Sequence, residues 1–273
     1  MSLPLLSHDT AGEGPVLLLL HSSVCDRRMW DPQWRMFLDA GHRVVRCDFR
    51  GHGDTPAARG PYRDATDVRD VLDALGIAEA AVVASSAGGA VALELAARLP
   101  ERVTSLVLLN TASPAHRPSA ALRDFDAREA ALLDSGDVAG AVELNVATWL
   151  GPEADANTRA MVRLMQRRAF EAHLAVENAE DGGPADGGEG AAEAGAPAFR
   201  LRDVRARTLA VSGAHDLPDF REIAAGLPGL LPAARHVELP WAGHLPSLER
   251  PAETALLVLD FVRDRQGTGV PRR

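Results

Sequence analysis

Residues 80–93 read Ala-Ala-Val-Val-Ala-Ser-Ser-Ala-Gly-Gly-Ala-Val-Ala-Leu, and no other part of the chain carries a stronger fold signal. The run Ala80 to Ala84 is apolar and ends in a turn of small residues, which predicts a buried strand. Residues Ala87 to Leu99 place apolar side chains at helical spacing, and Pro100 closes the segment. A buried strand followed through a tight turn by a helix is typical of an α/β fold.

The same alternation extends in both directions from this segment. A helix is predicted over Asp64 to Leu75, and a final helix is predicted from Pro251 to about Arg263. Further apolar runs predict strands at Val16 to Leu20, Arg43 to Cys47, Ser105 to Leu109, Thr208 to Ser212 and Arg235 to Leu239. Apolar strands that alternate with helices indicate a mostly parallel, doubly wound sheet covered on both faces.

A helical insert interrupts this pattern. Three segments with apolar residues three and four positions apart predict helices at Ala121 to Leu133, Val138 to Leu150 and Thr158 to Val176. Residues 177–197 are rich in Gly, Ala, Pro and acid and predict a flexible link. We therefore expect an α/β core over 1–112 and 204–273 and a helical cap over 113–203.

The turn at Ser86 carries the first candidate for chemistry. A serine between a strand and a helix stands above the sheet edge, and its neighbours two positions away must be small. Here those neighbours are Ala84 and Gly88. The pattern resembles the nucleophile elbow, G-x-S-x-G, of the α/β-hydrolase family, with Ala84 in place of the first glycine. The resemblance implies that Ser86 is the catalytic nucleophile.

Two later loops resemble the family's acid and base. Gly-Ala-His-Asp ends at Asp216, and Pro-Trp-Ala-Gly-His-Leu-Pro contains His244; each follows a predicted strand. The order Ser, Asp, His is the family's order. Alone, either residue would be typical of an ordinary loop, and His52 and His215 are competing bases. The order and the strand context together favour Ser86, Asp216 and His244 as the triad.

The resemblance also implies an oxyanion hole made of backbone N–H groups. One donor would be Ala87, directly after the nucleophile. The other would come from the loop after Leu20, which reads His-Ser-Ser-Val-Cys, with Ser23 favoured over Ser22. Ser22 stands where the family has glycine, so its hydroxyl could also bind the substrate or the oxyanion.

Several residues are candidates for the substrate pocket or for plain packing. A helical lid over the site would supply apolar walls, and Met161, Leu164 and Phe170 of the predicted insert could form part of them. An arginine in the pocket would favour an anionic substrate, and the candidates for it are Arg27, Arg28 and Arg163. The pocket candidates are Ser22, Trp30, Ser85, Trp149, Met165 and Leu217. The segment Cys47-Asp-Phe-Arg-Gly-His-Gly-Asp-Thr resembles the family's D-x-R-G-x-G turn, which we interpret as structural and braced by Asp48 and Arg50.

Composition narrows the function classes. The 273 residues are 46% hydrophobic and 25% charged, which is typical of a globular protein. A net charge of -9 and no basic patch argue against nucleic acid as a partner. No lysine occurs, which excludes Schiff-base chemistry and a P-loop. Cys25 and Cys47 form no metal-ligand spacing, so we expect no metal and no cofactor, and a reduced, cytoplasmic protein. No membrane segment is visible, and a monomer or homodimer is expected.

These features together predict a serine hydrolase that cleaves a small-molecule carboxylic ester or lactone through an acyl-enzyme. Hydrolysis of a C–C bond, cofactor-free perhydrolysis and a biosynthetic cyclisation are alternatives that use the same triad. A ligand-binding protein without turnover, or an interaction protein that uses the acidic link, are further alternatives from other classes.

Overall fold

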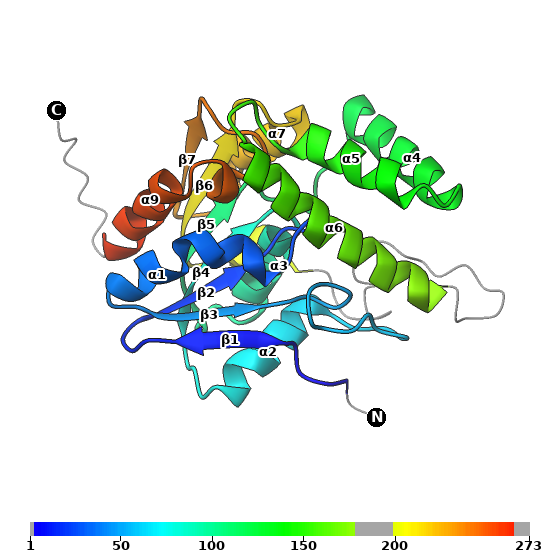
Figure 1. Cartoon of the computed structure of the whole chain (residues 1–273). Helices are drawn as coiled ribbons and strands as arrows, with labels where there is room; N and C mark the ends of the chain where they lie inside the picture. Colours follow the sequence, from blue (N-terminus) through cyan, green and yellow to red (C-terminus); the bar gives the residue numbers. More distant parts are fainter. Residues whose placement is uncertain (1–2, 178–198, 265–273) are drawn as a thin grey trace.

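A seven-stranded sheet in the order β1-β3-β2-β4-β5-β6-β7 runs through the described part of the chain, residues 3–177 and 199–264 of the computed structural model in Figure 1. Only β1 is antiparallel to its neighbour, and the other strands pair in parallel. The strands are β1 His8–Ala11, β2 Val16–Leu20, β3 Arg43–Cys47, β4 Ala80–Ser85, β5 Val103–Leu109, β6 Arg207–Gly213 and β7 Ala234–Leu239. The predicted mostly parallel α/β sheet is confirmed.

Helices cover both faces of the sheet because parallel strands need crossover connections. Helices α1 (Asp31–Asp39) and α9 (Pro251–Arg263) pack together over one face, and α2 (Asp64–Ala74) and α3 (Ala87–Arg98) cover the other. Helix α7 (Pro218–Gly226) lies between β6 and β7 in the chain. Shorter helices are η1 Arg27–Trp30, η2 Leu201–Asp203, η3 Leu227–Gly229 and α8 Pro246–Glu249.

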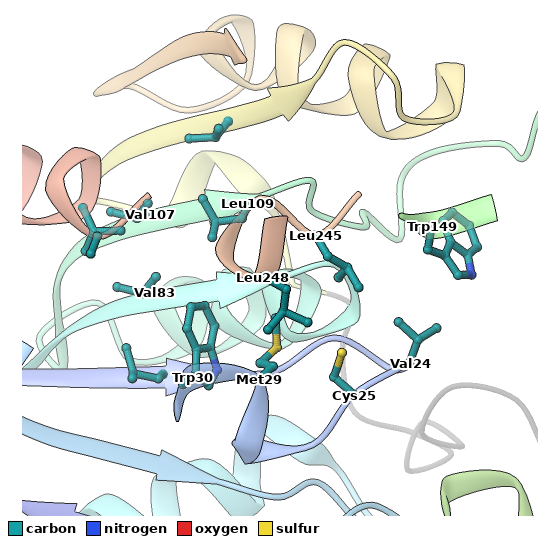
Figure 2. Close-up of a cluster of buried hydrophobic side chains, with 14 of the residues drawn as sticks. Val24, Cys25, Met29, Trp30, Val83, Val107, Leu109, Trp149, Leu245 and Leu248 are labelled. Atoms are coloured by element: carbon teal, nitrogen blue, oxygen red, sulfur yellow. The ribbon is translucent and has the colours of Figure 1, made fainter. Parts of the chain in front are cut away.

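Two apolar clusters result, one on each face of the sheet. Strand β4 shows why, since successive side chains point to opposite faces: Val83 belongs to one cluster and Val82 to the other. Figure 2 shows the first cluster, in which Met29, Leu245 and Leu248 lie near the carboxyl ends of the strands. Trp149 joins this cluster from a separate element.

Among the described residues between β5 and β6 lie the short η2 and three α-helices, and these three form the helical insert. They are α4 (Ala120–Asp134), α5 (Val138–Trp149) and α6 (Ala156–Glu177), and Figure 1 shows them grouped beyond the strand ends. Asp219 of α7 accepts hydrogen bonds from the Ser119 N–H at 2.7 Å and hydroxyl at 2.6 Å, which anchors the start of α4. The predicted link at 177–197 lies outside the described residues except for Glu177. None of the described helices is long and apolar enough to cross a bilayer.

Candidate active site

Ser86 occupies the sharp turn between β4 and α3. Its φ of 53° and ψ of -120° lie in a region that side chains rarely adopt, and the main chain on both sides fixes it. The Ser86 N–H donates to the Leu109 carbonyl at 3.0 Å, and the Ser86 carbonyl accepts from the Gly89 N–H at 2.8 Å. The residue is 5% exposed. The sheet therefore holds Ser86 at its carboxyl edge in a strained conformation.

Asp216 and His244 lie together at the same edge of the sheet, after β6 and β7. The Nδ1 of His244 lies 2.7 Å from Asp216 Oδ2, and both side chains are buried. The other carboxylate oxygen accepts from the Leu217 N–H at 2.7 Å. The hydroxyl of Ser86 makes no hydrogen bond to His244 in the described structure. Catalytic hydrogen bonds of this kind often tighten only when substrate binds.

Asn110 joins the loops that carry the acid and the histidine. Its side-chain amide donates to the Gly243 carbonyl at 2.7 Å, and its side-chain oxygen accepts from the Gly213 N–H at 2.8 Å. Its φ is 46°, the only positive value besides Ser86 among non-glycine residues of the described chain. The sequence analysis did not identify Asn110. A polar residue directly after the apolar run of β5 was the available signal.

Glu249 of α8 holds the histidine loop from the other side. Its carboxylate accepts from the Gly243 N–H at 2.9 Å and from the Leu245 N–H at 3.3 Å, on either side of His244. Burial raises the pKa of Glu249 above its usual value. Glu249 was not predicted as a site residue, because nothing in the spacing of a sequence reports which backbone N–H groups a carboxylate will contact.

The loop after β2 brings two backbone donors toward the elbow. The Ser22 N–H contacts the Met29 sulfur at 3.4 Å. In contrast, the N–H groups of Ser23 and Ala87 have no acceptor among the residues described. A free N–H at the first turn of a helix is a ready donor to an anion. Ser23 and Ala87 thus have the character required of oxyanion donors.

Two other histidines near this edge, His21 and His52, are weak bases because they are buried. Burial lowers the pKa of His21 to about 4 and that of His52 to about 3. His21 Nε2 accepts from the Phe49 N–H at 2.9 Å, so its proton lies on Nδ1, which donates to the Ser22 carbonyl. His52 Nε2 lies 2.9 Å from the Ser23 carbonyl oxygen. His215 is exposed.

The pocket candidates fall into different environments. Leu164 is 57% exposed, so it is not part of the buried packing of the insert. Leu217 is half-buried and contributes its N–H to Asp216. The hydroxyls of Ser22 and Ser85 are buried without a partner in the part of the chain described, and such donors are costly unless something satisfies them. Trp30, Met165 and Trp149 are buried in the apolar cluster around Met29.

The three candidate arginines are already paired. Arg27 bonds to Asp9, Asp48 and Asp54, Arg28 bonds to Asp26, and Arg163 bonds to Glu143. This corrects the suggestion that one of them offers a free charge to an anionic substrate.

The turn after β3 was predicted to be structural. Its Arg50 pairs with Asp67 at 2.7 Å. Asp48 and Arg50 therefore brace the turn, but each does so through a different partner.

Comparison with known proteins identifies the fold family. A family model described as the alpha/beta hydrolase fold matches residues 15–251. The chain belongs to the α/β-hydrolase family. It is therefore an α/β-hydrolase enzyme, and relatives over nearly its whole length are named as hydrolases, while another is named as a non-heme bromoperoxidase.

Three relatives illustrate the range of the named activities. A protein of Variovorax paradoxus, provisionally named carbamate hydrolase RutD, is 34% identical and the match covers 95% of this chain and 96% of the relative. The pimeloyl-[acyl-carrier protein] methyl ester esterase of Aromatoleum aromaticum is 34% identical, covering 91% and 98%. The crystal structure of the enol-lactonase of Burkholderia xenovorans superposes with a TM-score of 0.72 at 27% identity, covering 94% and 96%.

Proposed function

We propose that this α/β-hydrolase cleaves a small-molecule carboxylic ester or lactone through an acyl-enzyme formed on Ser86. The observation that carries the proposal is the hydrogen bond of 2.7 Å between His244 and Asp216 at the sheet edge that also bears the strained elbow. A serine hydroxyl is a weak nucleophile unless a base removes its proton, and an oriented imidazole is such a base.

In the acylation half, Ser86 Oγ attacks the substrate carbonyl carbon while His244 Nε2 takes the hydroxyl proton. Asp216 accepts the Nδ1–H, which fixes the tautomer and stabilises the imidazolium. The negative charge moves to the carbonyl oxygen, where the N–H groups of Ala87 and Ser23 donate to it. The C–O bond then breaks, and the leaving alcohol takes the proton from His244.

In the second half, a water molecule replaces the alcohol. His244 takes a proton from this water, and the resulting hydroxide attacks the acyl carbon. The same two N–H groups stabilise the second oxyanion. The bond to Ser86 breaks, the serine regains the proton from His244, and the carboxylic acid leaves. A lactone follows the same steps, with its alcohol still tethered to the acid.

Ester and lactone substrates are supported by two further observations. The relatives with the named methyl ester esterase and enol-lactonase activities cover nearly the whole chain. A serine at position 86 also disfavours reactions that need a carboxylate nucleophile, such as epoxide opening. The helical insert would then act as a cap over the site.

A fluorophosphonate probe tests the proposal, because an activated serine attacks its phosphorus, displaces fluoride and becomes phosphonylated. We expect the wild-type protein to be labelled and Ser86→Ala to show no labelling. Assays with p-nitrophenyl esters, lactones, dienoic ketoacids and hydrogen peroxide would then separate ester and lactone hydrolysis from C–C cleavage and perhydrolysis. Wild-type protein that folds but takes up no probe would refute the proposal.

A further inference from the structure

The ring of His244 is enclosed by two aromatic side chains from different parts of the chain. The centroid of Trp149, at the end of α5, lies 4.6 Å from the imidazole centroid, with a tilt of 43° between the planes. Phe220 of α7 lies at 4.3 Å, edge to face at 65°. The main chain adds a further link, since the His244 N–H donates to the Trp149 carbonyl at 2.9 Å.

Trp149 is itself held in place by the helical insert. Its indole N–H donates to Asn145 Oδ1 at 2.8 Å, one turn earlier on α5. The amide of Asn145 donates to Glu129 of α4. Phe125, also of α4, packs edge to face on the indole at 4.7 Å. The indole is therefore fixed by α4 and α5 before it reaches His244.

This packing distinguishes Trp149 from an ordinary pocket wall. The residue is only 5% exposed, and its ring contacts Phe125, Phe220 and His244. Little of it is left to touch a substrate. Trp149 ends this chain of hydrogen bonds and lies against the imidazole of His244. It can therefore limit the orientations that the imidazole adopts.

We propose that Trp149 is a positioning residue through which the helical insert holds the imidazole of His244 and stabilises its protonated form. The proposal rests on the assignment of His244 as the base in the proposed function. Two consequences follow from the geometry. The two aromatic rings restrict rotation of the imidazole away from Asp216, and a positive charge on it would lie with its ring centroid 4.6 Å from that of an indole, within the range in which an aromatic ring attracts a cation, an attraction that strengthens where water is excluded.

Two carboxylates also face this region and set the background for any pH effect. Asp216 bonds to His244 Nδ1 at 2.7 Å, and Glu249 of α8 bonds to the N–H groups that flank His244. Neither belongs to the helical insert. A change at position 149 therefore leaves both charges in place and isolates the contribution of the indole.

The test compares Trp149→Phe with Trp149→Leu through the rate of labelling by the fluorophosphonate probe. Phenylalanine keeps a π face, and leucine keeps only apolar bulk. We expect the limiting labelling rate to fall about tenfold in Trp149→Leu and less than about threefold in Trp149→Phe, with the probe concentration at half-saturation nearly unchanged.

The pH dependence of the labelling rate is the second readout. In Trp149→Leu, the imidazolium that forms on His244 during acylation loses its contact with an indole ring. The acid limb of the profile should move to lower pH by about 0.5 unit in Trp149→Leu relative to Trp149→Phe. A residue that only maintained the fold would leave this limb unmoved. If Trp149→Leu does not fold, Trp149→Met offers a longer apolar side chain for the same comparison.

Val146→Ala is the matched control. Val146 is buried on the same helix, and its truncation loosens the packing of α5 without touching His244. We expect this variant to melt at a lower temperature but to keep the wild-type limiting rate and acid limb. Equal rates and limbs in the Phe and Leu variants, with the wild type labelled normally, would overturn the inference and leave the proposed function standing. A wild type that is never labelled would overturn both.

Discussion

Gly88→Ala should damage the reaction centre without altering any side chain that takes part in it. Gly88 lies in the first turn of α3, where the helix passes close to the end of β2. A Cβ at this position would lie 2.5 Å from the His21 carbonyl oxygen and 3.0 Å from the Leu20 carbonyl oxygen. Both neighbours are main-chain atoms of a central strand and its loop, so neither can rotate away.

The clash sets the size of the effect. Relief of the shorter contact requires the start of α3 to move from the β2 loop by about 0.9 Å, because a Cβ and a non-bonded oxygen are in ordinary contact only from about 3.4 Å. Overpacking of this kind typically costs about 1–3 kcal/mol of unfolding free energy. The same movement separates the N–H of Ala87 on α3 from the N–H of Ser23. Because oxyanion donors must lie within about 2.7–3.1 Å of the oxyanion, we expect the acylation rate to fall roughly 100-fold.

The assay is the limiting rate of probe labelling and of p-nitrophenyl ester hydrolysis, measured beside a urea unfolding curve. Gly60→Ala is the control, because a Cβ at Gly60 meets no atom within 4 Å and its φ is not positive. This control should match the wild type in rate. A Gly88→Ala protein that is destabilised as expected but reacts at the wild-type rate would refute the link between this glycine and the oxyanion geometry.

Three further substitutions test other parts of the site and of the core. Asp216→Asn should lower the acylation rate about 10³–10⁴-fold, because the wrong tautomer of His244 is favoured, and the measurement is single-turnover ester hydrolysis at pH 7. Glu249→Gln should cost about 1–3 kcal/mol in urea unfolding and lower the labelling rate, because the amide replaces one accepting carboxylate oxygen by an NH2 donor, which cannot accept from a backbone N–H. Burial raises the pKa of Asp64 from 3.8 to about 7, so the folded state is favoured at low pH and loses stability as pH rises toward 7. Asp64→Asn should therefore remove about 2 kcal/mol of the decline in unfolding free energy between pH 5 and pH 8, whereas Asp124→Asn, with a 72% exposed side chain, should keep the wild-type slope.

The apolar strands were predictable because a buried parallel strand must be almost wholly apolar. Strands β2 and β3 match their predicted bounds, and β5 begins two residues earlier at Val103. Strand β1 was missed because its sequence, His-Asp-Thr-Ala, is polar and pairs only along the sheet edge. Helix α1 was also not predicted, although Pro32 at its start and the buried Phe37 were available signals.

The positions of Asp216 and His244 could be anticipated from strand ends, since the carboxyl ends of parallel strands converge on one edge. The residues that hold the loops of Asp216 and His244 in place could not be anticipated in this way. Asn110 bonds to backbone groups of loops far away in the chain, and Glu249 bonds to backbone groups of the histidine loop just before it; no pattern of residue types in the sequence reports either contact. The place of Trp149 depends on how α5 packs against the core, and helical periodicity predicts which side is apolar but not what that side touches.

Taken together, the register of the sheet determines the geometry of the site. Asn110 directly follows β5, and its two side-chain bonds reach the end of β6 and the loop after β7. These bonds form only while Leu109 pairs with Val211 and Gly213 pairs with Leu239. A slip of one residue in β6 would move its carboxyl end by about 3.3 Å and turn its side chains to the other face. The apolar runs that fix the register therefore also fix the distance between Asp216 and His244.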